Sequence, residues 1–174
     1  MAIRQDTLVG GVVHRVAYHP AAIVLVSVLV LVAQSYLGHK LPLMAVVDLP
    51  LLTVVYFSIV LRSPMTGTLG GTALGLAQDA MGGHALGVNG MLKAIIGYTA
   101  ASLGVRLDVE NMLSRMLLAA VFTVANSVIG YVMVTRLEGL ELQWLWLHEA
   151  SRVLANGLIA APLYWTLDRL RRRD

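Results

Sequence analysis

The sequence has no cysteine and few charged residues: of its 174 residues, 13% are charged and 57% are apolar. The absence of cysteine excludes disulfides, thiolate metal sites, iron–sulfur ligation and thiol nucleophiles. The shortage of charge excludes an ordinary water-soluble domain, because a domain this small exposes much of its surface and needs polar residues to cover it. With a mean hydropathy of +0.74, the chain is expected to be an all-α integral membrane protein whose solvent is the lipid bilayer.

Six apolar runs approach the length of a bilayer-spanning helix, which needs about 20 mainly apolar residues. We expect a single domain over residues 1–174 with six transmembrane helices, at about residues 20–37, 43–61, 66–81, 87–105, 112–135 and 147–167. The first run is expected to be a retained helix, because it is longer than a secretory signal segment and Leu31-Val32-Ala33 is a poor cleavage site. The third run is short and rich in glycine, so a re-entrant segment is the alternative there, and it would reverse the orientation of everything after it.

Basic residues indicate the orientation, because arginine and lysine concentrate on the cytoplasmic side of membrane proteins. With both termini in the cytoplasm, nine arginines fall in cytoplasmic segments and only Lys40 and Arg136 fall outside. Four arginines lie in the last six residues beside an apolar run, which is typical of a membrane flank and not of nucleic-acid binding. The connections are too short for a folded soluble domain, so we expect no soluble catalytic module.

Polar residues inside the apolar runs are functional candidates, because charge is costly in hydrocarbon. Under the expected topology seven of them share the outer half of the membrane: Asp48, Asp79, Lys93, Asn126, Glu149, Arg152 and Asn156. They are the candidate partner-binding or ligand-binding residues. The inner half is expected to hold no comparable set.

Three interpretations of this polar set stay open. Asp48, Asp79 and Lys93 can form an internal ion pair that only fixes helix packing, since buried charges are normally paired. The set can instead form an outward-facing surface that recognises a ligand or a partner. An ion or proton path is disfavoured, because it needs ionisable residues that continue to the inner face.

Gly67, Gly71 and Gly75 recur every four residues in the third run, and Asp79 continues the same helix face. Small residues at this spacing allow helix backbones to approach closely in lipid. The stripe therefore predicts close helix packing, either within the chain or between subunits. Catalytic chemistry is not indicated: the five histidines lack metal-ligand spacing, and no nucleophile–base pair or phosphate-binding loop is present. We expect no enzyme, no metal site and no cofactor.

Residues 71–87 read G-T-A-L-G-L-A-Q-D-A-M-G-G-H-A-L-G. This segment resembles the run G-x-x-x-G-x-x-x-D-x-x-x-G-x-x-L-G of the bacterial rod shape-determining protein MreD family. The matching positions are Gly71, Gly75, Asp79, Gly83, Leu86 and Gly87, and the resemblance implies a helix-packing role for Gly83 and Gly87 as well. One departure is Pro50, which follows Asp48, whereas in the family proline more often precedes this acidic position.

The resemblance implies a multi-pass protein of the bacterial cytoplasmic (inner) membrane with a fold similar to the six-helix substrate-binding subunits of energy-coupling-factor transporters. It implies a non-enzymatic scaffold or regulatory subunit of the elongation machinery that builds the lateral peptidoglycan wall. The implied partners are the bitopic protein MreC, with MreB and RodA and a class B penicillin-binding protein. The alternative is a vitamin-binding subunit of an energy-coupling-factor transporter.

Overall fold

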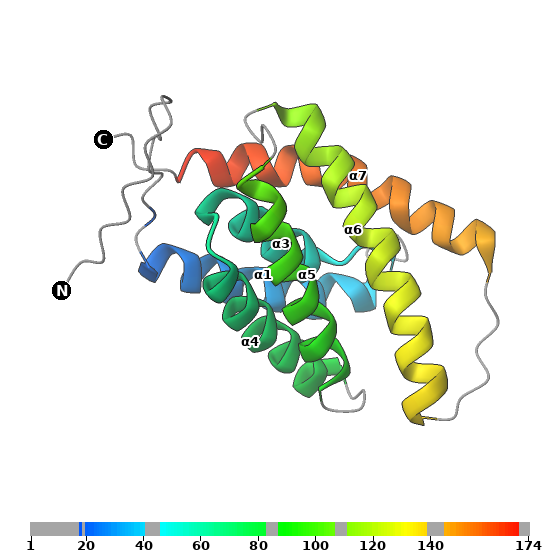
Figure 1. Cartoon of the computed structure of the whole chain (residues 1–174). Helices are drawn as coiled ribbons and strands as arrows, with labels where there is room; N and C mark the ends of the chain where they lie inside the picture. Colours follow the sequence, from blue (N-terminus) through cyan, green and yellow to red (C-terminus); the bar gives the residue numbers. More distant parts are fainter. Residues whose placement is uncertain are drawn as a thin grey trace.

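The computed structural model describes residues 18, 20–40, 46–82, 87–106, 111–138 and 145–170, and these residues form helices and no strands (Figure 1). The six α-helices of this part are α1 (Pro20–Lys40), α3 (Leu49–Leu61), α4 (Pro64–Gly82), α5 (Val88–Gly104), α6 (Met112–Met133) and α7 (Trp146–Asp168). A short π-helical segment, η1 (Val134–Glu138), continues α6. The expected all-α class is confirmed, and five of the six helices begin and end within a few residues of the expected bounds.

The second helix differs from the expectation, because α3 begins at Leu49 and not near residue 43. The Asp48 side chain caps the helix by accepting a hydrogen bond from the Leu51 N–H at 2.9 Å, and Pro50 stands in the first turn. A proline there lacks only an N–H that has no helical partner. These two residues fix the start of α3, which at 13 residues is about 20 Å long.

α3 is the central helix of the bundle. Residues 50–59 are all buried, and α3 contacts α1, α4, α5, α6 and α7. A helix that is apolar on every side is either buried in a protein core or spans a membrane, and the burial of α3 places it in the core of the bundle. One side packs on α5 and α6 through the cluster Leu51, Val55, Ile59, Ile96, Ala100 and Phe122. The other side packs on α6 and α7 through the cluster Leu52, Tyr56, Phe57, Ala119, Ala160, Tyr164 and Leu167.

α4 and α5 lie side by side (Figure 1), and three glycines of α4 allow this close contact. A Cβ atom added to Gly67, Gly71 or Gly75 would lie closer than 3.0 Å to a backbone carbonyl oxygen of α5. Gly87 serves another purpose: nothing lies within 4 Å of its added Cβ, and its φ of 107° is one that glycine adopts without strain. Gly87 therefore provides the backbone turn that leads into α5 and is not a packing residue. Gly83 lies outside the described residues.

Large apolar side chains cover the outside of the bundle. Those of α1, α6 and α7 are at least half exposed at many positions, among them Val24, Leu25, Leu29, Val121, Leu154 and Leu158. Apolar surface of this extent is not found on a soluble monomer. By length and hydropathy two of the described helices, Pro20–Gly38 and Met112–Arg136, qualify as bilayer spans. The outer surface is therefore adapted to lipid.

Candidate functional site

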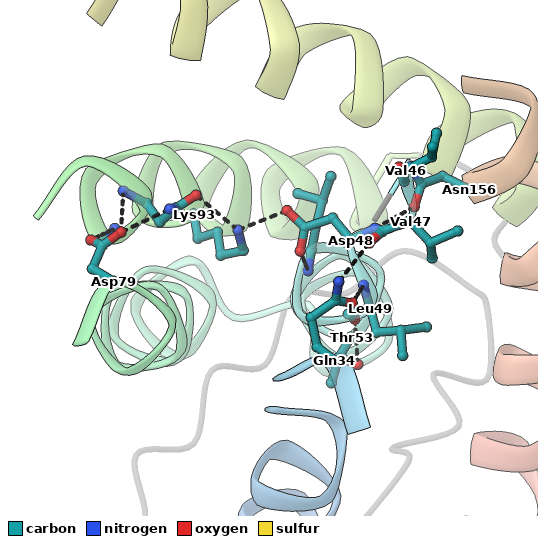
Figure 2. Close-up of polar contacts among 12 residues, drawn as sticks. Gln34, Val46, Val47, Asp48, Leu49, Thr53, Asp79, Lys93 and Asn156 are labelled. Carbon is teal, nitrogen blue, oxygen red and sulfur yellow. Dashed lines mark hydrogen bonds and ion pairs between the residues drawn. The ribbon is translucent and has the colours of Figure 1, made fainter. Parts of the chain in front are cut away.

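Lys93 of α5 is fully buried and forms an ion pair with Asp48. The distance between Lys93 Nζ and Asp48 Oδ2 is 3.0 Å, and the lysine side chain has no exposed surface. Lys93 Nζ also donates to Asn89 Oδ1 at 3.4 Å. Figure 2 shows the lysine reaching from the α4–α5 side of the site to the start of α3. A charge pair in this setting is stable because both partners are held in place and share further hydrogen bonds.

Asp79 at the end of α4 does not contact Lys93 directly. Its carboxylate accepts hydrogen bonds from the backbone N–H groups of Gly87, Asn89 and Gly90 at 2.9–3.3 Å. It also accepts from Asn89 Nδ2 at 2.7 Å. These N–H groups lie at the N-cap and in the first turn of α5 and have no partner inside that helix, and the helix dipole favours a negative charge there. Asp79 thus caps α5 from α4, and Asn89 links Asp79 to Lys93.

Two amide side chains extend the network to α1 and α7. Asn156 of α7 accepts a hydrogen bond from the Asp48 N–H through Oδ1 at 3.0 Å. Gln34 of α1 donates to the Val47 carbonyl at 2.9 Å and accepts from the Leu49 N–H at 3.0 Å. Both satisfy backbone groups at the start of α3 and in the two residues before it, which lipid could not satisfy. We call this set the Lys93 cluster: Gln34, Asp48, Asp79, Asn89, Lys93 and Asn156 (Figure 2).

The structure therefore brings four of the seven predicted polar residues into one network. Arg152 joins it only through its backbone carbonyl, which accepts from Asn156 Nδ2 at 2.9 Å. The Arg152 side chain pairs at 3.5 Å with Glu149, three residues earlier on α7. Asn126 is 6% exposed. Its Oδ1 atom, the Ser127 hydroxyl and Glu149 Oε2 are buried without a hydrogen-bond partner in the structure.

A second polar cluster lies at the opposite end of the bundle, and the expectation that this half would hold no comparable set is wrong. Arg115 of α6 pairs with Asp168 of α7 at 2.7 Å. The Tyr56 hydroxyl donates to Asp168 at 2.6 Å and lies 2.6 Å from the Tyr18 hydroxyl. We call Tyr18, Tyr56, Arg115 and Asp168 the Arg115 cluster. It joins the start of α1, α3, the start of α6 and the end of α7.

Replacing Tyr56 with Phe tests the Arg115 cluster, because it removes the hydroxyl and keeps the ring that packs in the core. We expect the free energy of unfolding to fall by about 1–3 kcal/mol, since two partly buried hydrogen bonds are lost and Asp168 loses the Tyr56 donor. Thermal unfolding in detergent measures this. Tyr98→Phe is the control, because Tyr98 is 57% exposed; an equal loss of stability in both variants would contradict a special role of the Tyr56 hydroxyl.

Sequence reasoning missed Gln34, Asn89 and the Arg115 cluster. Gln34 interrupts an otherwise apolar run and Asn89 precedes Lys93 by one helical turn, so both carried a usable signal. Arg115 and Asp168 lie at the ends of apolar runs, where a charged side chain is normally in contact with water or headgroups. Only the packing of α3 against α6 and α7 shows that Arg115 is buried.

The charged residues of the two clusters are engaged with neighbouring helices. Within the described ranges, no group of three or more histidine or acidic residues is placed to hold a metal ion. Lys93 pairs with Asp48 and Arg115 pairs with Asp168, whereas Asp79 accepts hydrogen bonds from the start of α5. The fold and the site define a small helical membrane protein whose buried charges connect its helices.

A comparison with models of protein families identifies the family of this chain. The model of the family described as rod shape-determining protein MreD matches residues 14–173, so the chain belongs to the MreD family. Membership links the chain to the determination of rod cell shape and to the machinery that maintains it. No curated protein and no solved structure matches the chain.

Proposed function

We propose that the chain is a non-enzymatic scaffold or regulatory subunit of lateral cell-wall elongation that docks MreC in the bacterial cytoplasmic membrane. The six helices cross the bilayer with both termini in the cytoplasm, so the Lys93 cluster lies toward the outside and the Arg115 cluster toward the inside. In this orientation α1, α3, α4, α5, α6 and α7 alternate in direction. MreB, RodA and a class B penicillin-binding protein associate with the chain through the same assembly.

The observation that carries this proposal is the set of unsatisfied acceptors on the outer half of α6 and α7. The Lys93 cluster satisfies its own charges, whereas Asn126 Oδ1, Ser127 Oγ and Glu149 Oε2 have no donor. Buried acceptors without donors cost free energy. Of the three residues, Glu149 keeps 19% of its side chain exposed, so a rotation of its carboxylate would bring Oε2 to a donor on a partner and recover that part of the cost.

The alternative, a vitamin-binding transport subunit, requires a pocket on the outer side. The described pocket at that end, of about 260 Å³, is lined by none of the charged residues of the Lys93 cluster. The charged residues of the Lys93 cluster are engaged with each other. Both observations favour the scaffold.

Co-purification from detergent-solubilised membranes tests the proposal. The tagged chain is expected to recover MreC, and Glu149→Arg is expected to reduce the recovery several-fold at equal membrane level, because it replaces an acceptor with a donor. Glu138→Arg, a change of the same kind outside α7, is the control. Purified chain that carries no MreC but retains a vitamin-sized molecule, detected by mass spectrometry, would contradict the proposal.

A further inference from the structure

An exposed arginine, Arg62, stands at the end of α3 beside the mouth of a cavity. It directly follows Leu61, which lines that cavity, and comes four residues before Thr66, which also lines it. Within the described ranges no acidic residue lies within ion-pair distance of Arg62. The residue has a φ of 51°, a conformation that glycine adopts with less strain. The backbone turn itself therefore does not require an arginine here.

Hydroxyl groups accompany this charge. The Thr66 hydroxyl donates to the Ser63 hydroxyl at 3.0 Å, and this hydrogen bond lies in an exposed position. Arginine binds phosphate oxygens through two parallel hydrogen bonds, and these charge-assisted bonds are stronger than neutral ones. Hydroxyl groups of serine and threonine can donate to the same oxygens. A cation next to two hydroxyls is thus a donor set suited to a phosphate group.

Positive charge is in excess around this end of the bundle. The described residues there include four arginines, Arg62, Arg106, Arg115 and Arg169, against one acid, Asp168. Asp168 is engaged by Arg115 at 2.7 Å, and the other three arginines are exposed. Basic residues at a membrane surface attract anionic headgroups more strongly than zwitterionic ones.

The cavity beside Arg62 lies between α1 and α4 and has the length of one leaflet. Its volume is about 280 Å³, and it extends from Ile23 to Leu31 on α1 and from Thr66 to Leu74 on α4. Each stretch advances by eight residues, which corresponds to about 12 Å along a helix. One leaflet supplies about 15 Å of hydrocarbon. The cavity therefore suits a single lipid tail, and it is too short for a membrane-spanning helix.

The part of α1 that borders the cavity is only loosely packed. Over residues 20–31 Val30 is the one buried side chain, whereas Val24 and Val28, which line the cavity, are 63% and 51% exposed. Each neighbour that an apolar side chain contacts contributes dispersion energy. A hydrocarbon tail between α1 and α4 would therefore strengthen the attachment of α1 to the bundle.

We infer that this end of the chain binds one anionic phospholipid, with a tail in the α1–α4 cavity and its phosphate on Arg62 and the hydroxyls of Ser63 and Thr66. In the orientation proposed above, the lipid belongs to the cytoplasmic leaflet. It acts as a structural ligand that holds α1 in place. The binding is independent of MreC, whose proposed contact is on the outer half of α6 and α7.

Thermal unfolding of the delipidated full chain in detergent tests this inference. Phosphatidylglycerol should raise the unfolding midpoint in a saturable way, because it binds the folded chain. Its affinity should be roughly fivefold higher than that of phosphatidylcholine with the same tails. Native mass spectrometry should count one bound phosphatidylglycerol per chain. Glycerol phosphate, the headgroup chemistry without tails, should not shift the midpoint; an equal shift would identify a soluble anion as the ligand and overturn the inference.

Two pairs of variants test the two parts of the site. Arg62→Gln should abolish the preference for phosphatidylglycerol, whereas Arg106→Gln, at an equally exposed arginine that does not adjoin the cavity, should keep it. Gly70 lines the cavity and nothing lies within 4 Å of its added Cβ, so Gly70→Leu should fill the cavity and weaken the binding of both lipids. Thr99→Leu, on the exposed side of α5, should bind both as the unchanged chain does.

Three results would overturn the inference. Equal losses in Arg62→Gln and Arg106→Gln would show a general attraction to a basic surface in place of a headgroup site. Unchanged lipid binding by Gly70→Leu would place the tail elsewhere. Equal affinity of the unchanged chain for the two lipids would exclude an anionic ligand. Recovery of MreC should be the same with Arg62→Gln as with the unchanged chain, so the proposed function is judged separately.

Discussion

Replacing Lys93 with Met is expected to lower the free energy of unfolding by about 3–5 kcal/mol, the usual result of removing one partner from a buried ion pair. The change leaves Asp48 as an uncompensated charge that is 7% exposed. It also removes the link through which α5 holds the start of α3. Thermal unfolding in detergent, or the amount of folded protein recovered from membranes, measures the loss.

A double variant separates lost pairing from lost packing. Asp48→Asn removes the charge and keeps an oxygen that can cap α3 through the Leu51 N–H. Combined with Lys93→Met, it should restore at least half of the lost stability, because no unpaired charge remains. Arg152→Met, which breaks the partly exposed pair with Glu149, should cost less than about 1 kcal/mol. A double variant as unstable as Lys93→Met would show that packing and not charge dominates.

The second large effect is expected at Gly71, where replacement by Ala should cost about 3 kcal/mol, the upper end of the usual cost of overpacking. The added methyl group would overlap the Lys93 carbonyl, and a backbone atom cannot move aside as a flexible side chain can. α4 and α5 would have to separate along the whole contact that Gly67, Gly71 and Gly75 form. Folded yield and thermal midpoint are the measurements.

Gly70→Ala provides a control at the neighbouring residue. Its methyl group meets nothing within 4 Å, so stability should stay the same or rise by up to about 1 kcal/mol through helix propensity. The two substitutions are chemically identical and differ only in the helix face they occupy. Similar losses at both positions would contradict the close α4–α5 contact.

The helices and the buried charges could be predicted from the sequence because each gives a local signal. Apolar runs of sufficient length marked the helices, and an ionisable residue inside such a run, as at Asp48 or Lys93, marked a site. The shorter α3 was also foreshadowed by Asp48 and Pro50, a cap followed by a helix-starting proline. The expected start of this helix, near residue 43, is too early because the apolar run continues on both sides of these two residues.

The pairing of the charges could not be predicted, because it depends on how helices are arranged around α3. Asp79 caps α5 instead of pairing with Lys93, and this requires the chain to turn at Gly87 with a φ of 107°. Arg115 is in the first turn of α6, where sequence position indicates depth in the membrane but not burial. Its contact with Asp168 spans 53 residues, beyond the reach of any local pattern.

The enclosure of α3 has a consequence for biogenesis. This helix leaves the ribosome early, yet most of the surface that shields it belongs to α5, α6 and α7, which are synthesised later. A nascent chain that ends before α7 leaves Tyr56 and the rest of that side without the cover of Ala160, Tyr164 and Leu167, and it cannot form the contact with Asp168. Chains truncated after α6 should therefore be degraded faster than the full chain in a pulse-chase experiment, and equal half-lives would show that α3 is secured before synthesis is complete.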